Sequence, residues 1–364
     1  MRHRVLASLA KVLLVSGALV FALWLVGILI SDRVLLTQYV AWVPNWLVGF
    51  MIVGTVSLGW VLAGIAERER LRVAASFAAG AAVIVFARMA VVDMRLMNFA
   101  LPGRPPAERA AIELSYWNPA KARLASFERA AVETMGADVV VVANPPGGSN
   151  ARKVAQALGL AHVESRPPLH VLSRFEITAW GWTRLGLNTR SRFRNPDGSW
   201  GAVVDHGRAM FVVLDTTSVH GKPTTLWILD LPSDPTRHRV EIVQGLLEAT
   251  REWAPSPVPT RGKGPWGVAP EGWAEGTGFP QPDVIIGDLN IPRGSYSIGL
   301  IAPGFQNAQR WARPGWHFSW PRTPTLLHID QAFVAPGWSA RGYRLVDPGV
   351  GFHEAQRMWI LPPE

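Results

Sequence analysis

Apolar residues are concentrated at the start of the chain. Three runs, at about 8–30, 39–65 and 73–92, are almost entirely apolar, and each approaches or exceeds the roughly 20 residues that a helix needs to cross a bilayer. Buried core helices are the alternative interpretation. The first run is long and two more follow it, which argues against a cleaved signal peptide. The pattern predicts a membrane anchor over residues 1–95 with three transmembrane helices.

Basic residues flank these runs unevenly. Arg2, Arg4 and Lys11 lie at the start of the first run. Arg68, Arg70 and Arg72 lie between the second and third runs, whereas only Arg33 lies between the first and second. Because cytoplasmic loops carry the excess of basic residues, the N-terminus and the 66–72 loop are expected in the cytoplasm. Three crossings then place everything after about residue 93 on the extracytoplasmic side of the cytoplasmic membrane.

The pattern changes after the third run. Residues 96–110 are rich in proline and predict a linker. From residue 111 onward, strand-like and helix-like segments alternate, which predicts an α/β domain over 111–364. Strands are expected near 112–118, 139–142, 169–175, 208–214, 224–230, 284–288, 329–334, 341–345 and 356–361, and helices near 119–135, 151–158, 236–252 and 303–312. The Pro/Gly-rich stretch 254–282 is expected to be a surface loop near the active face.

Composition limits the chemistry. The chain has no cysteine, which excludes disulfides and a thiol nucleophile. Its formal net charge is +9 at pH 7, which suits an anionic membrane surface or a phosphorylated substrate. The charge is diffuse and forms no dense basic block outside the anchor, so nucleic acid is possible as a partner but not favoured.

Residues 284–290 carry the most informative local pattern. Val284, Ile285 and Ile286 form a β-branched run that predicts a buried strand. Asp288 and Asn290 follow two positions apart, so on extended backbone they would project to the same side. A carboxylate and a carboxamide side by side can hold a phosphate, a water molecule or a hard cation.

Eight segments, taken in order, resemble motifs of the endonuclease/exonuclease/phosphatase superfamily. Gly287-Asp-Leu-Asn290 matches "gly-asp-phe-asn", and the others are Ser115–Asn118, Asp138–Asn144, Leu172–Ile177, Trp227–Ser233, Phe318–Pro321, His328–Val334 and Gly351–His353. The resemblance implies a four-layer α/β sandwich of two packed mixed β-sheets flanked by helices, here preceded by three transmembrane helices. The architecture is also similar to that of membrane proteins associated with glycopeptide resistance in actinomycete-type bacteria.

In this superfamily Mg²⁺ or another divalent cation polarises a phosphate while a His–Asp pair activates water. By position the resemblance carries over five residues: Asn118, Asp288, Asn290, Asp330 and His353. Plainer roles are open for four of them. Asn118 could cap the following helix, Asp288 and Asn290 could form a turn, and His353 could be a surface histidine. Asp330 lies inside an apolar strand, where an unpaired carboxylate is costly.

Three positions depart from the superfamily pattern. The glutamate that normally binds the metal aligns with Asn144, a catalytic histidine aligns with Asp230, and the aspartate before His353 aligns with Phe352. Phe352 is expected to remove the group that orients His353. Either the centre is rearranged, with Asp230 as ligand or base, or hydrolysis is lost. The rearranged centre has Asp288, Asn290, His353, Asp330 and Asp230 as catalytic residues, Asn118 and Asn290 contacting substrate, and Asn144, Asp288 and Asp230 at the metal.

These observations lead to three hypotheses on function. The first is a membrane-anchored, extracytoplasmic, metal-dependent phosphoesterase acting on a phosphorylated lipid or lipid-linked pyrophosphate, because a tethered domain meets lipids at high effective concentration. The second is a catalytically silent module that binds a phosphate group or a partner. The third is an extracytoplasmic nuclease, which is less favoured because free nucleic acid requires no anchor.

Overall fold

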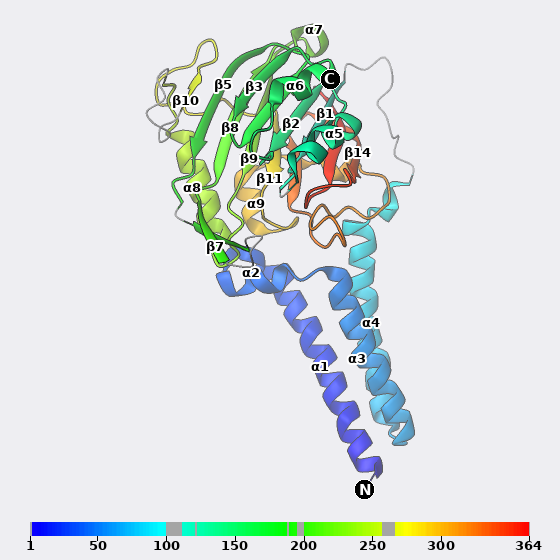
Figure 1. The fold of residues 1–364 in the computed structure, drawn as a ribbon. Coiled ribbons are helices and arrows are strands. Elements are labelled where there is room, and N and C mark those ends of the chain that lie inside the picture. Colours follow the sequence, from blue (N-terminus) through cyan, green and yellow to red (C-terminus); the bar gives the residue numbers. More distant parts are fainter. Residues whose placement is uncertain are drawn as a thin grey trace. The chain divides into compact units, whose positions relative to one another are not determined.

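The computed structural model describes residues 2–99, 111–120, 122–187, 189–194, 200–256 and 266–363, and for 189–194 and 200–205 it describes the backbone alone (Figure 1). The chain divides into two compact units. The helical unit comprises Met1–Met97 with Pro314–Trp316, and the α/β unit comprises Asn98–Arg313 with His317–Glu364. The predicted linker falls almost entirely on residues 100–110, outside the described residues.

Three long helices make up most of the helical unit. They are α1 (Arg2–Ile30), α3 (Asn45–Ile65) and α4 (Glu69–Arg88), with shorter elements α2 (Leu35–Ala41), η1 (Ser31–Arg33), η2 (Met89–Asp93) and η3 (Leu96–Asn98) at their ends. Three stretches, Arg2–Arg33, Asn45–Ile65 and Glu69–Asp93, are long and apolar enough to cross a membrane. The prediction of three candidate spans is therefore confirmed.

The length of the second apolar run suggests one continuous helix, but the structure shows two helices, α2 and α3. The structure breaks it between α2 and α3, where Pro44 has extended backbone dihedrals (φ −58°, ψ 136°). Proline disfavours helical backbone for the residue before it, so the chain turns here and a new helix begins at Asn45. The Asn45 side chain then accepts a hydrogen bond from the Trp24 indole and donates one to Asp93, both at 2.7 Å, and joins the three long stretches.

The α/β unit contains two large mixed sheets. The first has the strand order β14-β15-β1-β2-β4-β3, the second has the order β10-β5-β8-β9-β11-β13-β12, and β6 and β7 form a separate pair. Most neighbours are antiparallel, but β1 and β2 are parallel, as are β9 and β11. The strand bounds are β1 (Ile112–Trp117), β2 (Val139–Ala143), β3 (His162–Arg166), β4 (Leu169–Ser173), β5 (Ile177–Arg184), β6 (Thr189–Arg194), β7 (Trp200–Asp205), β8 (Arg208–Leu214), β9 (Thr224–Asp230), β10 (Trp266–Val268), β11 (Val284–Asp288), β12 (Gln306–Asn307), β13 (Asp330–Val334), β14 (Ser339–Val346) and β15 (Ala355–Leu361).

Helices cover the outer faces of both sheets. They are α5 (Leu124–Thr134), α6 (Ala151–Leu158), α8 (Arg239–Arg251) and α9 (Tyr296–Ile301), whereas α7 (Thr217–His220) and the 3₁₀ turn η4 (Ala308–Trp311) pack against the central core. Helices α5 and α6 bury Phe127 and Val154 on the first sheet, and α8 buries Leu246 against the second.

The central core lies between the two sheets. Leu114 and Val141 from the first sheet share one buried cluster with Ile228 and Ile286 from the second. The unit therefore has four layers: helices, sheet, sheet and helices. The predicted four-layer α/β sandwich is confirmed.

Candidate functional site

Three aspartates lie in one row across the second sheet. Asp288 at the end of β11 is the register partner of Asp230 on β9 and of Asp330 on β13. All three follow the alternation of the residues that face the central core, such as Ile228, Ile286 and Ala332. Because register neighbours on adjacent strands lie about 4.5–5.5 Å apart, the sheet itself gathers three carboxylates at one end of the core. Asp230, Asp288 and Asp330 are only 6%, 3% and 0% exposed.

The turn after β11 fixes the central aspartate. A Cβ atom at Gly287 would collide with the carbonyl oxygen of Leu229 on β9, so this position requires glycine for close strand packing. Asn290 lies beyond the strand with φ +49°, a conformation that asparagine tolerates best among residues with a side chain. Its backbone N–H donates to Asp288 Oδ1 at 3.0 Å, and its side chain donates to the Leu231 carbonyl at 2.8 Å. The backbone is therefore not extended through Asn290, and the two residues form the turn that the sequence left open, in which Asn290 supports Asp288.

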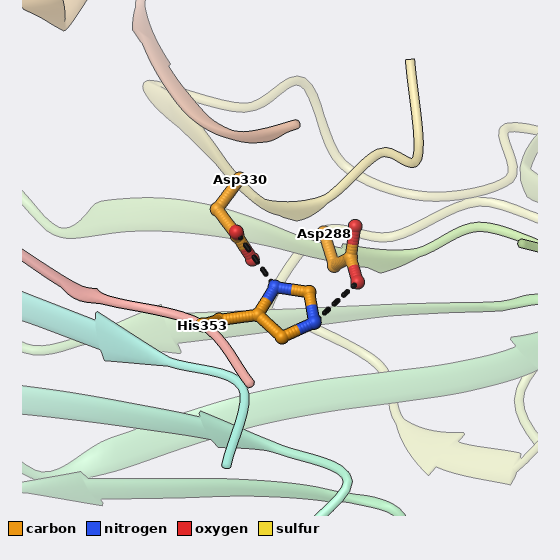
Figure 2. A group of neighbouring side chains, drawn as sticks. All are labelled: Asp288, Asp330 and His353. Carbon is orange, nitrogen blue, oxygen red and sulfur yellow. Dashed lines mark hydrogen bonds and ion pairs between the residues drawn. The ribbon is translucent and has the colours of Figure 1, made fainter. Parts of the chain in front are cut away.

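His353 lies between two of these aspartates (Figure 2). Its Nδ1 is 2.8 Å from Asp330 Oδ2, and its Nε2 is 3.9 Å from Asp288 Oδ2. The ring is buried, with 4% of the residue exposed. The sequence suggested that Phe352 leaves the histidine without an orienting carboxylate. This expectation is wrong, because Asp330 on β13 orients the ring. The Phe352 residue itself is 41% exposed.

The first sheet contributes residues to the same place. Asn118, just after β1, donates from Nδ2 to Asp288 Oδ2 at 2.8 Å and accepts a bond from the Ala120 backbone through Oδ1. Asn118 therefore closes a local turn and holds the central carboxylate, but it does not cap the following helix, which begins at Leu124 with Arg123 at its N-cap. Tyr116, two positions earlier, is completely buried. Burial, followed by Asp330, Asp288 and Asp230, raises the pKa of its phenol well above 10 and keeps it a neutral donor.

Asn144 and Asp230 interact directly across the two sheets. Asn144 Nδ2 donates to Asp230 Oδ1 at 2.9 Å, and Arg208 Nη1 lies 3.4 Å from Asp230 Oδ2. Asn144 also has a left-handed backbone, with φ +49°. The candidate site residues from the sequence therefore converge at one end of the two sheets. Their individual roles stay predictions.

The electrostatics of the buried cluster follow from its crowding. Burial, together with Asp330 and Asp230, raises the pKa of Asp288 to about 7, and His353 only partly offsets this. Burial alone would lower the pKa of His353, but its bond and charge interaction with Asp330, with Asp288 and Asp230 adding to them, raise that pKa to about 9. At neutral pH the imidazole is a proton donor, and Asp288 is poised between its two states.

Two carboxylates of this cluster, Asp288 and Asp330, offer oxygen ligands to a divalent cation, whereas His353 would join them only through an unprotonated nitrogen. Donor atoms of Asp288, Asp330 and His353 lie within 4.8 Å of one another. Asp330 Oδ1 is buried and has no hydrogen-bond partner among the described residues, and a carboxylate oxygen in that position is a ligand that Mg²⁺ or Ca²⁺ accepts. The set expected from the sequence, Asn144, Asp288 and Asp230, shares only Asp288 with this group.

Two supporting residues escaped the sequence reasoning. Ser319 is completely buried; its hydroxyl accepts from the Asp330 backbone N–H at 3.2 Å, and its carbonyl accepts from the Glu354 N–H at 2.9 Å. It thereby fixes both sides of the His353–Asp330 pair. Its place in the motif Phe318–Pro321 was the available signal. Arg208 gave no signal of its own, because it only opens a strand whose other residues are all apolar.

No family model matches this chain, and no curated protein matches it. Solved structures similar to it include an endonuclease/exonuclease/phosphatase from Beutenbergia cavernae, at 14% identity and TM-score 0.43, covering 70% of this chain and 72% of that one. A functionally unknown conserved protein from Enterococcus faecalis has 14% identity and TM-score 0.42, with 69% and 99% covered. The inositol polyphosphate 5-phosphatase domain of SPSynaptojanin, solved with inositol (1,4)-bisphosphate and calcium, has 10% identity and TM-score 0.37, with 69% and 84% covered. The similarity concerns the fold alone.

Proposed function

We propose that the α/β unit is a divalent-metal-dependent phosphoesterase. The observation that carries this proposal is the buried His353 held between Asp330 and Asp288, with Nδ1 bonded to one and Nε2 directed to the other (Figure 2). A histidine oriented by a carboxylate at one nitrogen leaves the other nitrogen to exchange a proton with a substrate or a water molecule.

Each residue has a distinct part in this chemistry. Asp330 fixes the tautomer and plane of the His353 ring, and Nε2 gives or takes the proton. Asn118 and the Asn290 backbone hold the two oxygens of Asp288. Asp288 would hold the cation, together with Asp230 and Asn144 or with Asp330. A bound cation supplies Lewis-acid stabilisation of phosphoryl oxygens and lowers the pKa of water.

The proposed substrate is a phosphorylated lipid or a lipid-linked pyrophosphate. The helical unit has three stretches apolar enough to span a membrane, and the basic flanks favour an extracytoplasmic α/β unit. A catalytic unit on the same chain as a membrane anchor meets headgroups at high effective concentration. Nucleic acid is the less favoured alternative, because the net charge of +9 is spread along the chain.

A silent phosphate-binding or partner-binding module is the second candidate, and one observation favours it. Asp230, which would add charge to the metal position, already accepts from Asn144 and lies beside Arg208. This internal pairing reduces the negative charge that a cation would find there.

A hydrolysis assay on the full chain in lipid nanodiscs separates the two. Release of phosphate from phosphatidic acid, from lipid pyrophosphates and from model monoesters and diesters would be measured with Mg²⁺, Mn²⁺ and Ca²⁺. We expect the wild type to hydrolyse at least one of these esters and the His353→Asn variant to hydrolyse none. The matched control is His162→Asn, a half-buried histidine on β3 outside the cluster. If no ester is cleaved and no cation binds the wild type, the silent module is the correct reading.

A further inference from the structure

Arg208 extends the aspartate row by one strand. It begins β8 and is the register partner of Asp230, so the four residues Arg208, Asp230, Asp288 and Asp330 lie on four adjacent strands. Arg208 follows the alternation of Met210 and Val212, which face the central core. Its side chain is 24% exposed, whereas that of Asp230 is 8% exposed. A guanidinium therefore stands at the open end of a row of buried carboxylates.

Asp230 has both carboxylate oxygens engaged within the chain. Oδ1 accepts from Asn144 at 2.9 Å, and Oδ2 faces Arg208 at 3.4 Å. A divalent cation at Asp230 would have to compete with the guanidinium for Oδ2. The positive charge that offsets Asp230 is thus part of the protein, and the neutral Asn144 beside it fits this arrangement because it adds no charge that needs a second cation.

The guanidinium also suits a phosphoryl group. It presents five N–H donors in a planar fork that matches two oxygens of a phosphate. Its contact with Asp230 is made by one terminal nitrogen at 3.4 Å, which is longer than a typical charge-assisted bond. Two further side chains that carry N–H or O–H groups lie near the row: His353 lies between Asp330 and Asp288, and Tyr116 is buried on β1 of the facing sheet. An isolated row of carboxylates would repel a phosphate, whereas this row has a cation at its solvent end.

We propose that Arg208 is the resident cation of this site: it binds the phosphoryl group of the substrate and occupies at Asp230 the place for which a divalent ion would compete. The inference rests on the proposed function for the identity of the anion. Two measurements on the full chain in detergent micelles test it without relying on turnover. One is the affinity of the metal-free, EDTA-treated protein for inorganic phosphate, and the other is the affinity for Mn²⁺ alone.

The variant Arg208→Gln should weaken phosphate binding by about tenfold or more, since hydrogen bonds to charged groups contribute that much, and it should tighten Mn²⁺ binding severalfold by removing a competing charge. Arg208→Lys keeps the charge but loses the fork, so it should weaken phosphate binding and leave Mn²⁺ affinity near that of the wild type. The matched control is Arg174→Gln. Arg174 pairs at 3.1 Å with Asp138, the residue that precedes β2. Arg174→Gln should alter neither the phosphate affinity nor the Mn²⁺ affinity.

Arg208 is not the resident cation if Arg208→Gln folds, as judged by its melting temperature, and both affinities stay at wild-type values. If that variant does not fold, unchanged phosphate affinity in Arg208→Lys overturns the proposal. Failure of the proposed function looks different: no ester would be cleaved, while phosphate would still bind in an Arg208-dependent manner. Conversely, turnover with Arg208-independent phosphate binding would leave the phosphoesterase standing and remove Arg208 from it.

Discussion

The Nδ1 atom of His353 lies 2.8 Å from Oδ2 of Asp330, although the two residues are 23 positions apart in the sequence. Both are buried, and the contact joins the loop before β15 to the start of β13. The orienting carboxylate therefore comes from a rigid strand, and not from the residue next to the histidine. The imidazole therefore keeps an orienting partner although its neighbour in the sequence is Phe352.

The His353–Asp330 pair gives the first prediction. Asp330→Asn replaces the acceptor at Nδ1 with an amide, which removes the charge that stabilises the protonated ring and permits the wrong tautomer. We expect the pKa of His353, about 9 in the intact cluster, to fall, and turnover to drop by roughly 10²–10⁴-fold. The titration would be followed by NMR of the imidazole. An unchanged His353 titration in a folded Asp330→Asn protein would contradict the assignment.

Cation binding should depend on pH through Asp288. Burial and the neighbouring carboxylates raise the pKa of Asp288 to about 7 in the metal-free protein, and a proton and a cation compete for the same carboxylate. Mn²⁺ affinity is expected to rise about tenfold per pH unit up to about pH 7 and then to level off. Titrations between pH 5.5 and about 8.5 measure this. Asp288→Asn should bind weakly at every pH, and a pH-independent wild type would disprove the coupling.

The same raised pKa predicts how stability changes with pH. Between the unfolded pKa of about 3.9 and the folded pKa of about 7, the folded protein holds a proton on Asp288 that the unfolded chain has lost. The metal-free protein should therefore become less stable as pH rises through this window, and added Mn²⁺ should restore stability most strongly at its upper end. Melting temperatures of the wild type and Asp288→Asn, with and without Mn²⁺, test this. Equal pH dependence in the two proteins would count against it.

Asn144→Glu should tighten cation binding while lowering stability. The glutamate adds a carboxylate beside Asp230, and its backbone must adopt the left-handed conformation (φ +49°) that asparagine tolerates better. The expected cost in free energy of unfolding is about 1–3 kcal/mol, together with loss of the bond to Asp230. Asn144→Gln pays the same strain without adding charge, so it should lower the melting temperature and leave Mn²⁺ affinity low. Equal Mn²⁺ affinities in the two variants would show that Asn144 lies away from the cation.

The orientation of the chain in the membrane can be tested with reporters. An enzyme that is active only outside the cytoplasm should give a signal when fused after Glu364 and none when inserted in the 66–72 loop, because that loop carries the basic residues. The reverse pattern would place the α/β unit in the cytoplasm and remove the argument for an outer-leaflet lipid.

Local pattern was enough to predict much of the fold. The β-branched run at Val139–Val142, the amphipathic helix near 236–252 and the strand ending at Asp288 correspond to β2, α8 and β11. The helix expected at 303–312 is wrong. Gly304 has φ +79°, which ends any helix there, and only the 3₁₀ turn η4 forms. The helix expected from 119 begins later, at Leu124.

The site divides along the same line. Asp288 and Asn290 were found because they belong to one short segment, and Asp330 because a carboxylate in an apolar strand is costly. Arg208 was missed because its importance comes from a partner 22 positions away on the next strand. The strands β3 and β5 were missed because their polar and aromatic residues mask the alternation of apolar and polar positions. Contacts made by register leave no trace in local spacing.

The lack of space for a side chain at Gly287, next to the Leu229 carbonyl, has a wider consequence. There is no room for a side chain at Gly287 between β9 and β11, and the main-chain pairing of the two strands brings Asp230 and Asp288 side by side. The strand pairing thus sets which residues are neighbours at this end of the sheet. Because the positions at this edge are register partners, exchanging an acid for an amide or a base at one of them changes the charge that its neighbours face, so a single substitution can alter the chemistry of the site.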